Sequence, residues 1–268
     1  MSREICAYCE LLNTLTREHL WPAALHSRLI TANKLESSKF WLARLQKEIP
    51  NEPQMRDVCA HCNNVVLSEL DAYICRFFDS TLIHMPLQDD KVTFEFNYHL
   101  LKRWLLKLSY NSARIHNSHD LHAIKAVLPY IMGQDDSMGK SIQLFLQFSY
   151  PQEVPEEDLD PETPLSVRPV IFSPTMHRLG HNFFRVDGIG QKVLRAIHLR
   201  SYTFYLAFFT LNESRAVLDD FANIFSQHSR SVLLRPSRPK LEVLCNGSGA
   251  WTSYKGSRSN RLVFNNDG

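Results

Sequence analysis

Two short cysteine pairs carry the clearest chemistry in this sequence. Cys6 and Cys9 form one C-x2-C pair, Cys59 and Cys62 form a second, and 49 residues lie between the pairs. Two residues between cysteines let one tight turn aim both sulfurs at one ion, and zinc is commonly held by four thiolates. Because four thiolates complete the tetrahedral shell of zinc, we expect a closed, structural site. The alternative is that these are ordinary core cysteines.

The other two cysteines, Cys75 and Cys245, have no partner at such a spacing, and we expect buried thiols. An even cysteine count in a secreted chain would instead favour disulfides. The first residues lack the basic and apolar regions of a signal peptide, so a cytoplasmic protein with reduced thiols is expected. No apolar run approaches the roughly 20 residues that span a bilayer, so we expect no membrane partner.

Residues of a second kind stand between and after the cysteine pairs. Glu18 and His19 are followed by Pro22, and Asn63 and Asn64 come directly after the last cysteine. An imidazole titrates near neutral pH and can take a proton from water. Carboxylate and amide oxygens are the ligands that a hard divalent cation prefers. Hydrolysis of a phosphodiester needs both an activated water and a cation that stabilises the charge on the phosphate.

The cysteine pairs, the Glu-His pair and the asparagine after the last cysteine together resemble the zinc-containing HNH endonucleases, a ββα-metal family built on a treble clef. The resemblance covers residues 5–78, under a third of the chain. It implies Zn²⁺ on the four cysteines, His19 as general base, and catalytic Mg²⁺ or Mn²⁺ on Glu18 and Asn63, with Asn64 as a further cofactor ligand. DNA is the implied substrate, and RNA is a further candidate.

Each of these residues also has a simpler explanation. Glu18 can pair with Arg17, His19 can be a hydrogen-bonded core histidine, and the two asparagines suit the start of a helix. Asp71 is expected at the surface, on the helix two turns beyond the asparagines. The glycine-rich turn of many HNH relatives is replaced by Ala23-Ala-Leu-His-Ser. The rival hypothesis is therefore a zinc module that binds nucleic acid or protein without cutting. An activity housed in residues 170–230 has no motif behind it.

Hydrophobic periodicity predicts an α+β protein in which a zinc module, residues 1–80, precedes a mixed α/β part of unrecognised fold. The module ends in a helix with an apolar stripe at three- and four-residue spacing: Leu67, Leu70, Ile74 and Phe77. A middle segment, 81–150, follows with strands at 91–96 and 142–150 and helices at 98–113 and 120–132. Lys102, Arg103 and Lys107 are expected on the polar side of the 98–113 helix, either solvated or against phosphates.

A segment with five prolines and six acids, residues 151–169, predicts a linker. The part after it, 170–268, is expected to hold strands at 170–173, 183–186 and 201–210 and a helix at 212–227 with Asn212 as N-cap. The polar, basic tail from Gly247 is expected to be largely disordered. We expect this C-terminal part to contact a partner protein or a second copy of the chain.

Overall fold

The computed structural model describes residues 3–34, 40–42, 45–50 and 52–263. The strands are β1 (Glu4–Ile5), β2 (Leu12–Asn13), β3 (Leu15–His19), β4 (Phe40–Leu42), β5 (Lys47–Ile49), β6 (Gln54–Cys59), β7 (Lys91–Glu95), β8 (Ile142–Tyr150), β9 (Gln152–Glu153), β10 (Ile171–Phe172), β11 (His177–Val186), β12 (Gly190–Leu199), β13 (Tyr202–Phe208), β14 (Val232–Leu234), β15 (Lys240–Leu244) and β16 (Ser248–Gly249). The α-helices are α1 (Ala23–Asn33), α2 (Ser68–Phe77), α3 (Tyr98–His116), α4 (Leu121–Lys125), α5 (Leu128–Ile131), α6 (Arg215–Ser229) and α7 (Ala250–Val263). Within these ranges no helix is long and apolar enough to cross a membrane.

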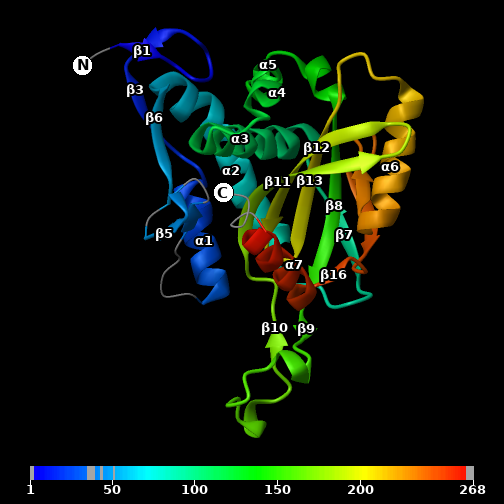
Figure 1. The fold of residues 1–268 in the computed structure, drawn as a ribbon. Coiled ribbons are helices and arrows are strands. Elements are labelled where there is room, and N and C mark those ends of the chain that lie inside the picture. Colours follow the sequence, from blue (N-terminus) through cyan, green and yellow to red (C-terminus); the bar gives the residue numbers. More distant parts are fainter. Residues whose placement is uncertain (1–2, 35–39, 43–44, 51, 264–268) are drawn as a thin grey trace.

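The N-terminal elements form a compact group at one side of the molecule (Figure 1). β1 pairs with β2, and β3 pairs antiparallel with β6 although 34 residues (20–53) lie between them. Two π-helical segments, Cys62–Leu67 and Phe78–Leu82, flank α2 and extend it at both ends. The expected apolar stripe of this helix is confirmed, since all four of its residues are buried. The strand pair and the helix thus meet where the second cysteine pair lies.

The largest sheet has the strand order β11-β12-β13-β8-β14, all antiparallel, and β16 adds to β8 in parallel. Strands from both sides of residues 151–169 therefore belong to one sheet, so this segment is a loop that leaves and rejoins the same sheet. The segment leaves the sheet after β8, forms the small β9–β10 pair, and returns to β11. Figure 1 shows it as an arm that projects from the body. The sheet is continuous across this segment because β8, which precedes it, pairs along seven residues with β13, which follows it.

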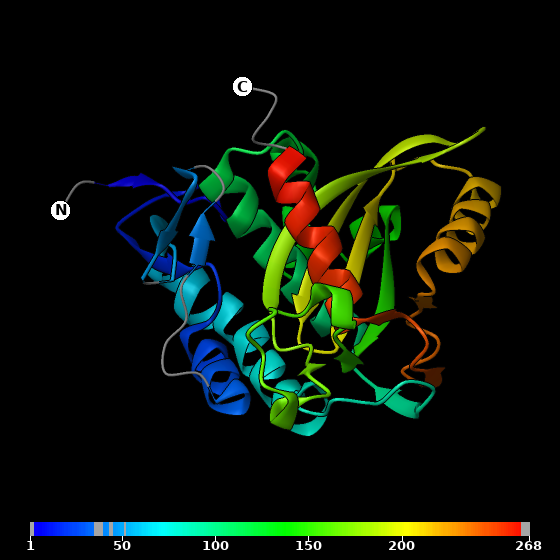
Figure 2. The ribbon, with the colours of Figure 1, turned by 60° about the horizontal axis from the view of Figure 1, so that its bottom comes forward.

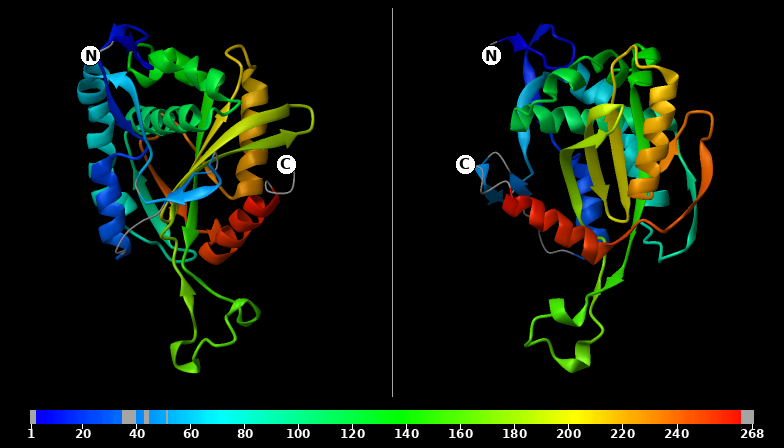
Figure 3. Two further views of the ribbon diagram at one scale, coloured as in Figure 1. Left: turned by 60° about the vertical axis from the view of Figure 1, so that its left-hand side comes forward. Right: turned by 45° about the vertical axis from the view of Figure 1, so that its right-hand side comes forward.

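The two faces of this sheet pack on different partners. Leu144, Leu146 and Phe204 belong to a core that continues through α3 and α2 into the zinc module. Phe145, from the other side of β8, packs with Phe221 and Phe225 of α6 and other apolar residues. Because neighbouring residues of a strand point to opposite faces, this alternation along β8 places α3 and α6 on opposite faces of the sheet. Figure 3 shows the sheet between these helices.

The middle and C-terminal elements differ from the expectations in several places. Strand β12 was not predicted from the sequence. The stretch Gly188–Gly190 lies at the turn that joins β11 to β12. Helix α6 begins at Arg215, and its N-cap is Ser214, two residues later than the expected cap. The side chain of Ser214 accepts the N–H of Val217. The expectation of a largely disordered tail is wrong for residues 247–263, which contain β16 and α7, while residues 264–268 lie outside the described part of the chain. Figure 2 shows α7 lying across the body. The helix forms although its side chains are mostly polar.

Helix α3 confirms the expected 98–113 helix, but its lysines are not solvated. Lys102 and Lys107 are 1% and 2% exposed, because α3 is enclosed by the zinc module, the sheet and α5. Lys102 Nζ donates to the carbonyl oxygens of Gly139, at 2.7 Å, and Ile142, at 2.5 Å, and to the hydroxyl of Tyr98, at 3.0 Å. Burial lowers the pKa of Lys102 to about 7. The amphipathic pattern would place these lysines in solvent if one side of the helix were exposed. Because α3 is covered on several sides, both lysines are buried.

We expect the free energy of unfolding to depend on pH because Lys102 is buried. The unfolded lysine keeps a pKa near 10.5 while the folded one titrates near 7, so between these values only the unfolded chain holds the proton. The free energy of unfolding then rises with pH over this window, by at most about 1.4 kcal/mol per pH unit. Below pH 7 the burial penalty is fully present.

Denaturant unfolding at pH 7 to 10 measures this effect as the difference between the wild type and Lys102→Met. The difference shifts in favour of the wild type as pH rises. The control is Lys140→Met at an exposed position, where the difference is expected to stay constant. A pH-independent difference for Lys102→Met would contradict the assignment.

Candidate metal centre and the adjoining site

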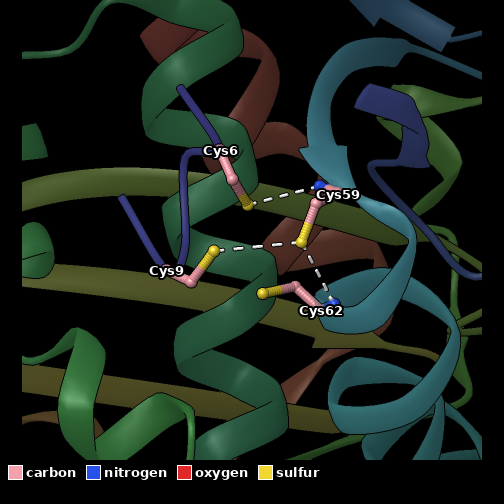
Figure 4. Close-up of side chains that lie close together, drawn as sticks. All are labelled: Cys6, Cys9, Cys59 and Cys62. Carbon is pink, nitrogen blue, oxygen red and sulfur yellow. Dashed lines mark hydrogen bonds between the residues drawn. The ribbon is translucent and has the colours of Figure 1, made fainter. Parts of the chain in front are cut away.

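The four cysteines of the two C-x2-C pairs meet in one cluster (Figure 4). Their sulfur atoms all lie within 4.8 Å of one another, and Cys9 Sγ is 3.8 Å from Cys59 Sγ. Four sulfurs at about 2.3 Å from a tetrahedral zinc ion lie about 3.8 Å apart. The cluster can therefore hold a metal ion such as zinc, and the expected ligand set, Cys6, Cys9, Cys59 and Cys62, comes together.

Local structure explains how two distant turns present four sulfurs to one point. Cys6 and Cys9 flank the tight turn between β1 and β2, while Cys59 ends β6 and Cys62 begins the helix. The backbone N–H of Cys59 donates to Cys6 Sγ at 3.2 Å, and the N–H of Cys62 donates to Cys59 Sγ at 3.5 Å. Such N–H donors orient metal-binding thiolates and stabilise their negative charge.

The thiols are electrostatically coupled. Burial alone would raise the pKa of Cys6, but backbone N–H donors at Cys59, Cys9 and Tyr8 outweigh it and lower the pKa to about 7. Burial, followed by the neighbouring sulfurs, raises the pKa of Cys62. Several thiolates cannot share this volume without a cation between them, because like charges at such separations repel strongly. A divalent cation removes that conflict.

The remaining cysteines behave as expected. Cys75 is 8% exposed and Cys245 is fully buried, and burial raises the pKa of both thiols, that of Cys245 to about 12. Neither belongs to the metal-binding group found among the described residues. His61, between two cluster cysteines, is exposed.

The turn that carries the first cysteine pair is anchored to α3. The Tyr8 hydroxyl donates to Asn111 Oδ1 at 2.6 Å, and the Tyr110 hydroxyl donates to the carbonyl oxygen of Ala7 at 2.9 Å. The guanidinium of Arg114 lies over the rings of Tyr8 and Tyr110 and pairs with Asp57 on β6. The cluster is therefore held both by its own strands and by a helix about 100 residues further along the chain.

Glu18 and His19 end β3 and point to opposite sides of it. A register shift between Thr16 and Arg17 turns both Leu15 and Glu18 inward, so Glu18 is 5% exposed. The carboxylate of Glu18 lies 2.8 Å from Lys107 Nζ and accepts a hydrogen bond from Asn111 at 3.1 Å. Its partner is thus a buried lysine of α3 and not the neighbouring Arg17 that sequence considerations suggested.

The same lysine binds Asp71 of α2, with Nζ 2.6 Å from Oδ2. Asp71 also accepts a hydrogen bond from the indole of Trp104. Asp71 was expected at the surface, but α3 covers it and desolvation raises its pKa, which Lys107 opposes. Glu18, Lys107 and Asp71 form a charged group that joins β3, α2 and α3. It leaves Glu18 turned toward the core, so the ligand set expected for Mg²⁺ or Mn²⁺ does not fit at this position.

The asparagines occupy the first turn of the helix after Cys62. Asn63 donates its side-chain N–H groups to Thr16 Oγ1, at 3.0 Å, and to the carbonyl oxygen of Arg17, at 2.9 Å. It thereby ties the helix start to the middle of β3. Asn64 is exposed. The side chain of Asn63 binds Thr16 and Arg17 and not His19. Without a carboxylate, the two amides alone are a poor set for a hard divalent cation.

His19 reaches the surface, with a side chain 37% exposed. Its Nδ1 lies 2.5 Å from Oε2 of Glu52, whose side chain is only 6% exposed. The other oxygen of Glu52 accepts the backbone N–H of Trp21. Burial raises the pKa of Glu52, while the hydrogen bond and charge of His19 oppose that shift. A carboxylate at Nδ1 holds the ring so that Nε2 is the nitrogen free to accept a proton.

A cavity of about 520 Å³ opens beside His19 and Glu52. Its remaining walls come from β3, α1, the start of β6 and the segment before it: Arg17, Ala23, His26, Ser27, Pro50 and Gln54. Arg17 and His19 share one side of β3, so a cation and an imidazole stand at the same opening. The sequence indicated His19 but not Glu52, since a lone acid 33 residues away from the histidine carries no spacing signal.

The comparisons with known proteins add no relative. No family model matches the chain, and no curated protein or solved structure matches it either. The functional assignment therefore depends on the residues themselves.

We expect the cysteine cluster to bind one zinc ion per chain and to stabilise the fold. Cys59→Ala removes a ligand, and elemental analysis of the purified variant is expected to find less than stoichiometric zinc together with a lower melting temperature. The control, Cys245→Ala, removes an equally buried thiol outside the cluster and keeps full zinc, with a cost of about 1 kcal/mol for the small cavity. Full zinc in Cys59→Ala would rule out the cluster as the metal centre.

We also expect Lys107 to be essential to stability. Lys107→Met leaves Glu18 and Asp71 buried without their cation, which typically costs about 3–5 kcal/mol in unfolding free energy. The same change at Lys125, whose ion pair with Glu10 is solvent-exposed, should cost about 1 kcal/mol or less. Chemical denaturation compares the two variants, and equal losses would contradict the role given to Lys107.

Proposed function

We propose that the N-terminal module is an HNH-like endonuclease module of the treble-clef type, clipped by Zn²⁺, which hydrolyses phosphodiester bonds of DNA. The observation that carries the proposal is the pair of His19 and Glu52, joined at 2.5 Å at the mouth of a surface cavity. The pair stands on the strand that the cysteine cluster secures through β6. A further support is the pattern of cysteine pairs, Glu-His and asparagine in the sequence.

The chain's own residues then divide the work as follows. His19 accepts a proton from water at Nε2 while the water oxygen attacks phosphorus and the bond to the leaving sugar oxygen breaks. Glu52 accepts the hydrogen bond of Nδ1 and so holds the imidazole in its orientation. Arg17, exposed at the same opening, attracts the phosphate backbone. Glu18 serves the fold through Lys107, a role that differs from the metal ligation implied by the resemblance.

In this reaction class a divalent cation, Mg²⁺ or Mn²⁺, would stabilise charge on the phosphate. Glu18, the carboxylate that the resemblance implies as its ligand, is instead bound by Lys107. The buried position of Glu18 specifically favours a second candidate function, a zinc module that binds nucleic acid or protein without cutting it. The two candidates differ in whether the His19–Glu52 pair is ever used in a reaction. RNA cleavage and action as a homodimer are further variants of the first candidate.

Plasmid cleavage by the full chain separates them. We expect nicking or cutting in Mg²⁺ or Mn²⁺ that EDTA abolishes. His19→Ala should lower the rate about 10²–10⁴-fold, the usual contribution of a general base. Glu52→Gln keeps the shape but loses the charge behind the ring, and a loss of about tenfold or more is expected. His122→Ala, at an exposed histidine of α4, is the matched control and should cleave normally.

Two results would count against the proposal. Cleavage at the wild-type rate by His19→Ala would reject this histidine as the base. Absence of cleavage by the wild type in either metal, with DNA binding retained, would establish the second candidate.

A further inference from the structure

A second cavity lies on the sheet face that carries α6, on the side of the sheet away from α3. It has a volume of about 520 Å³ and is bounded by β8, β11, β12, β13, α6 and the β16–α7 segment. Helix α6 covers only part of this face, where Phe145, Leu194 and Ala207 pack against it. The cavity occupies the part that α6 leaves uncovered. Cavities of this size are typical of sites for small molecules.

A polar row crosses the floor of this cavity. The strand register places Arg178 opposite His198, His198 opposite Thr203, and Thr203 opposite Gln147. Directly opposed residues point to the same face, so four polar side chains from four strands stand side by side. His198 Nδ1 is 2.9 Å from Thr203 Oγ1, and Gln147 accepts a hydrogen bond from the Tyr205 hydroxyl at 2.7 Å. An apolar row would be expected if this face were simply core.

The next row contains two small residues, Gly180 and Ala196, which are paired across β11 and β12. Gly180 has no local structural reason to be glycine. The β11–β12 register is regular on both sides of it, and a Cβ atom built there meets nothing within 4 Å. Glycine inside a strand often marks a bulge, a tight bend, or a place where a ligand or another backbone comes close. The regular register excludes a bulge at Gly180, and the open space beside it is room that a ligand can occupy.

The chemistry of the walls restricts that ligand. Arg178 is the one fully charged side chain among the described residues that line the cavity, three histidines accompany it, and none of the lining residues is an acid. Burial lowers the pKa of His198 to about 4, so this ring is neutral at physiological pH and offers hydrogen bonds. Arginine in a partly enclosed site binds phosphate or carboxylate well.

Aromatic rings form the wall next to the polar row. Phe184 and Tyr205 each meet Phe225 of α6 in an edge-to-face arrangement, at centroid distances of 5.2 and 5.3 Å. Such rings favour a flat partner. Asn182 and Ser253 at the rim add hydrogen-bonding groups for a polar ring or a sugar.

We propose that this cavity is a binding site for a small anion with a flat ring, of the nucleoside monophosphate class. The phosphate lies toward Arg178 and His198, and the base lies over Gly180 and Ala196 against Phe184 and Tyr205. The site is separate from His19, which belongs to the module on the other side of the sheet. It therefore does not depend on the nuclease assignment.

Calorimetric titration of the full chain with adenosine 5′-monophosphate tests the site, with adenosine and inorganic phosphate as the two partial probes. We expect the monophosphate to bind more tightly than either part. Gly180→Phe fills the cavity and should abolish binding, whereas Gly180→Ala adds one methyl group and should keep the affinity within about threefold. Both variants should fold, because the space above Gly180 is open and its φ is not in the left-handed region.

Arg178→Met provides a second, independent variant. It should weaken the monophosphate about tenfold or more and leave adenosine unchanged, since only the former carries the charge. Failure of the wild type to bind adenosine 5′-monophosphate would overturn the proposal. So would equal affinity of the wild type and a folded Gly180→Phe, or an affinity unaffected by Arg178→Met. Binding of phosphate alone as tight as the monophosphate would overturn the assignment of the aromatic wall.

Discussion

The clustering of four sulfur atoms in one small volume is the constraint on which the N-terminal module of this protein depends. They come from the β1–β2 turn and from the junction of β6 with its helix, which the chain separates by 49 residues. Packing alone gives little reason for such convergence, because the N-terminal segment is short and its strands are only a few residues long. A cation that binds all four thiolates supplies the free energy that such a segment lacks. The positions of β3 and the helix start then follow, since β3 pairs with β6 and Asn63 binds β3.

A second constraint joins this module to the rest of the chain. Glu18, Lys107 and Asp71 place two carboxylates and one ammonium in the space between β3, α2 and α3, and burial makes each of them dependent on the others. Glu18 and His19 are neighbours on β3 and point to opposite sides of it. Because Lys107 holds the carboxylate of Glu18 inside, His19 faces outward. A residue that resembles a metal ligand in sequence thus has a structural task, and the exposed histidine takes its orientation from Glu52.

The features predicted correctly depend mostly on residues close together in the sequence, and several features that depend on residues far apart were not predicted. The C-x2-C spacing and the stripe of Leu67 to Phe77 are local patterns, and both proved correct. The prediction that Lys102 and Lys107 lie in solvent was wrong because α3 is covered on several sides. Part of that cover is a sheet whose strands come later in the chain. Glu52 and Lys107 find their partners 33 and 89 residues away, at distances where no spacing rule applies. The continuous sheet across residues 151–169 was missed for the same reason: a proline-rich, acidic composition describes an arm as well as a linker.

X-ray absorption at the zinc edge of the purified full chain examines the metal site of the four cysteines without any mutation. We expect one zinc per chain with four sulfur neighbours at about 2.3 Å and no nitrogen or oxygen bound to the ion. A shell that includes nitrogen or oxygen, or a chain purified in zinc that retains none, would contradict it and would remove the basis for the positions of β3, the helix and His19.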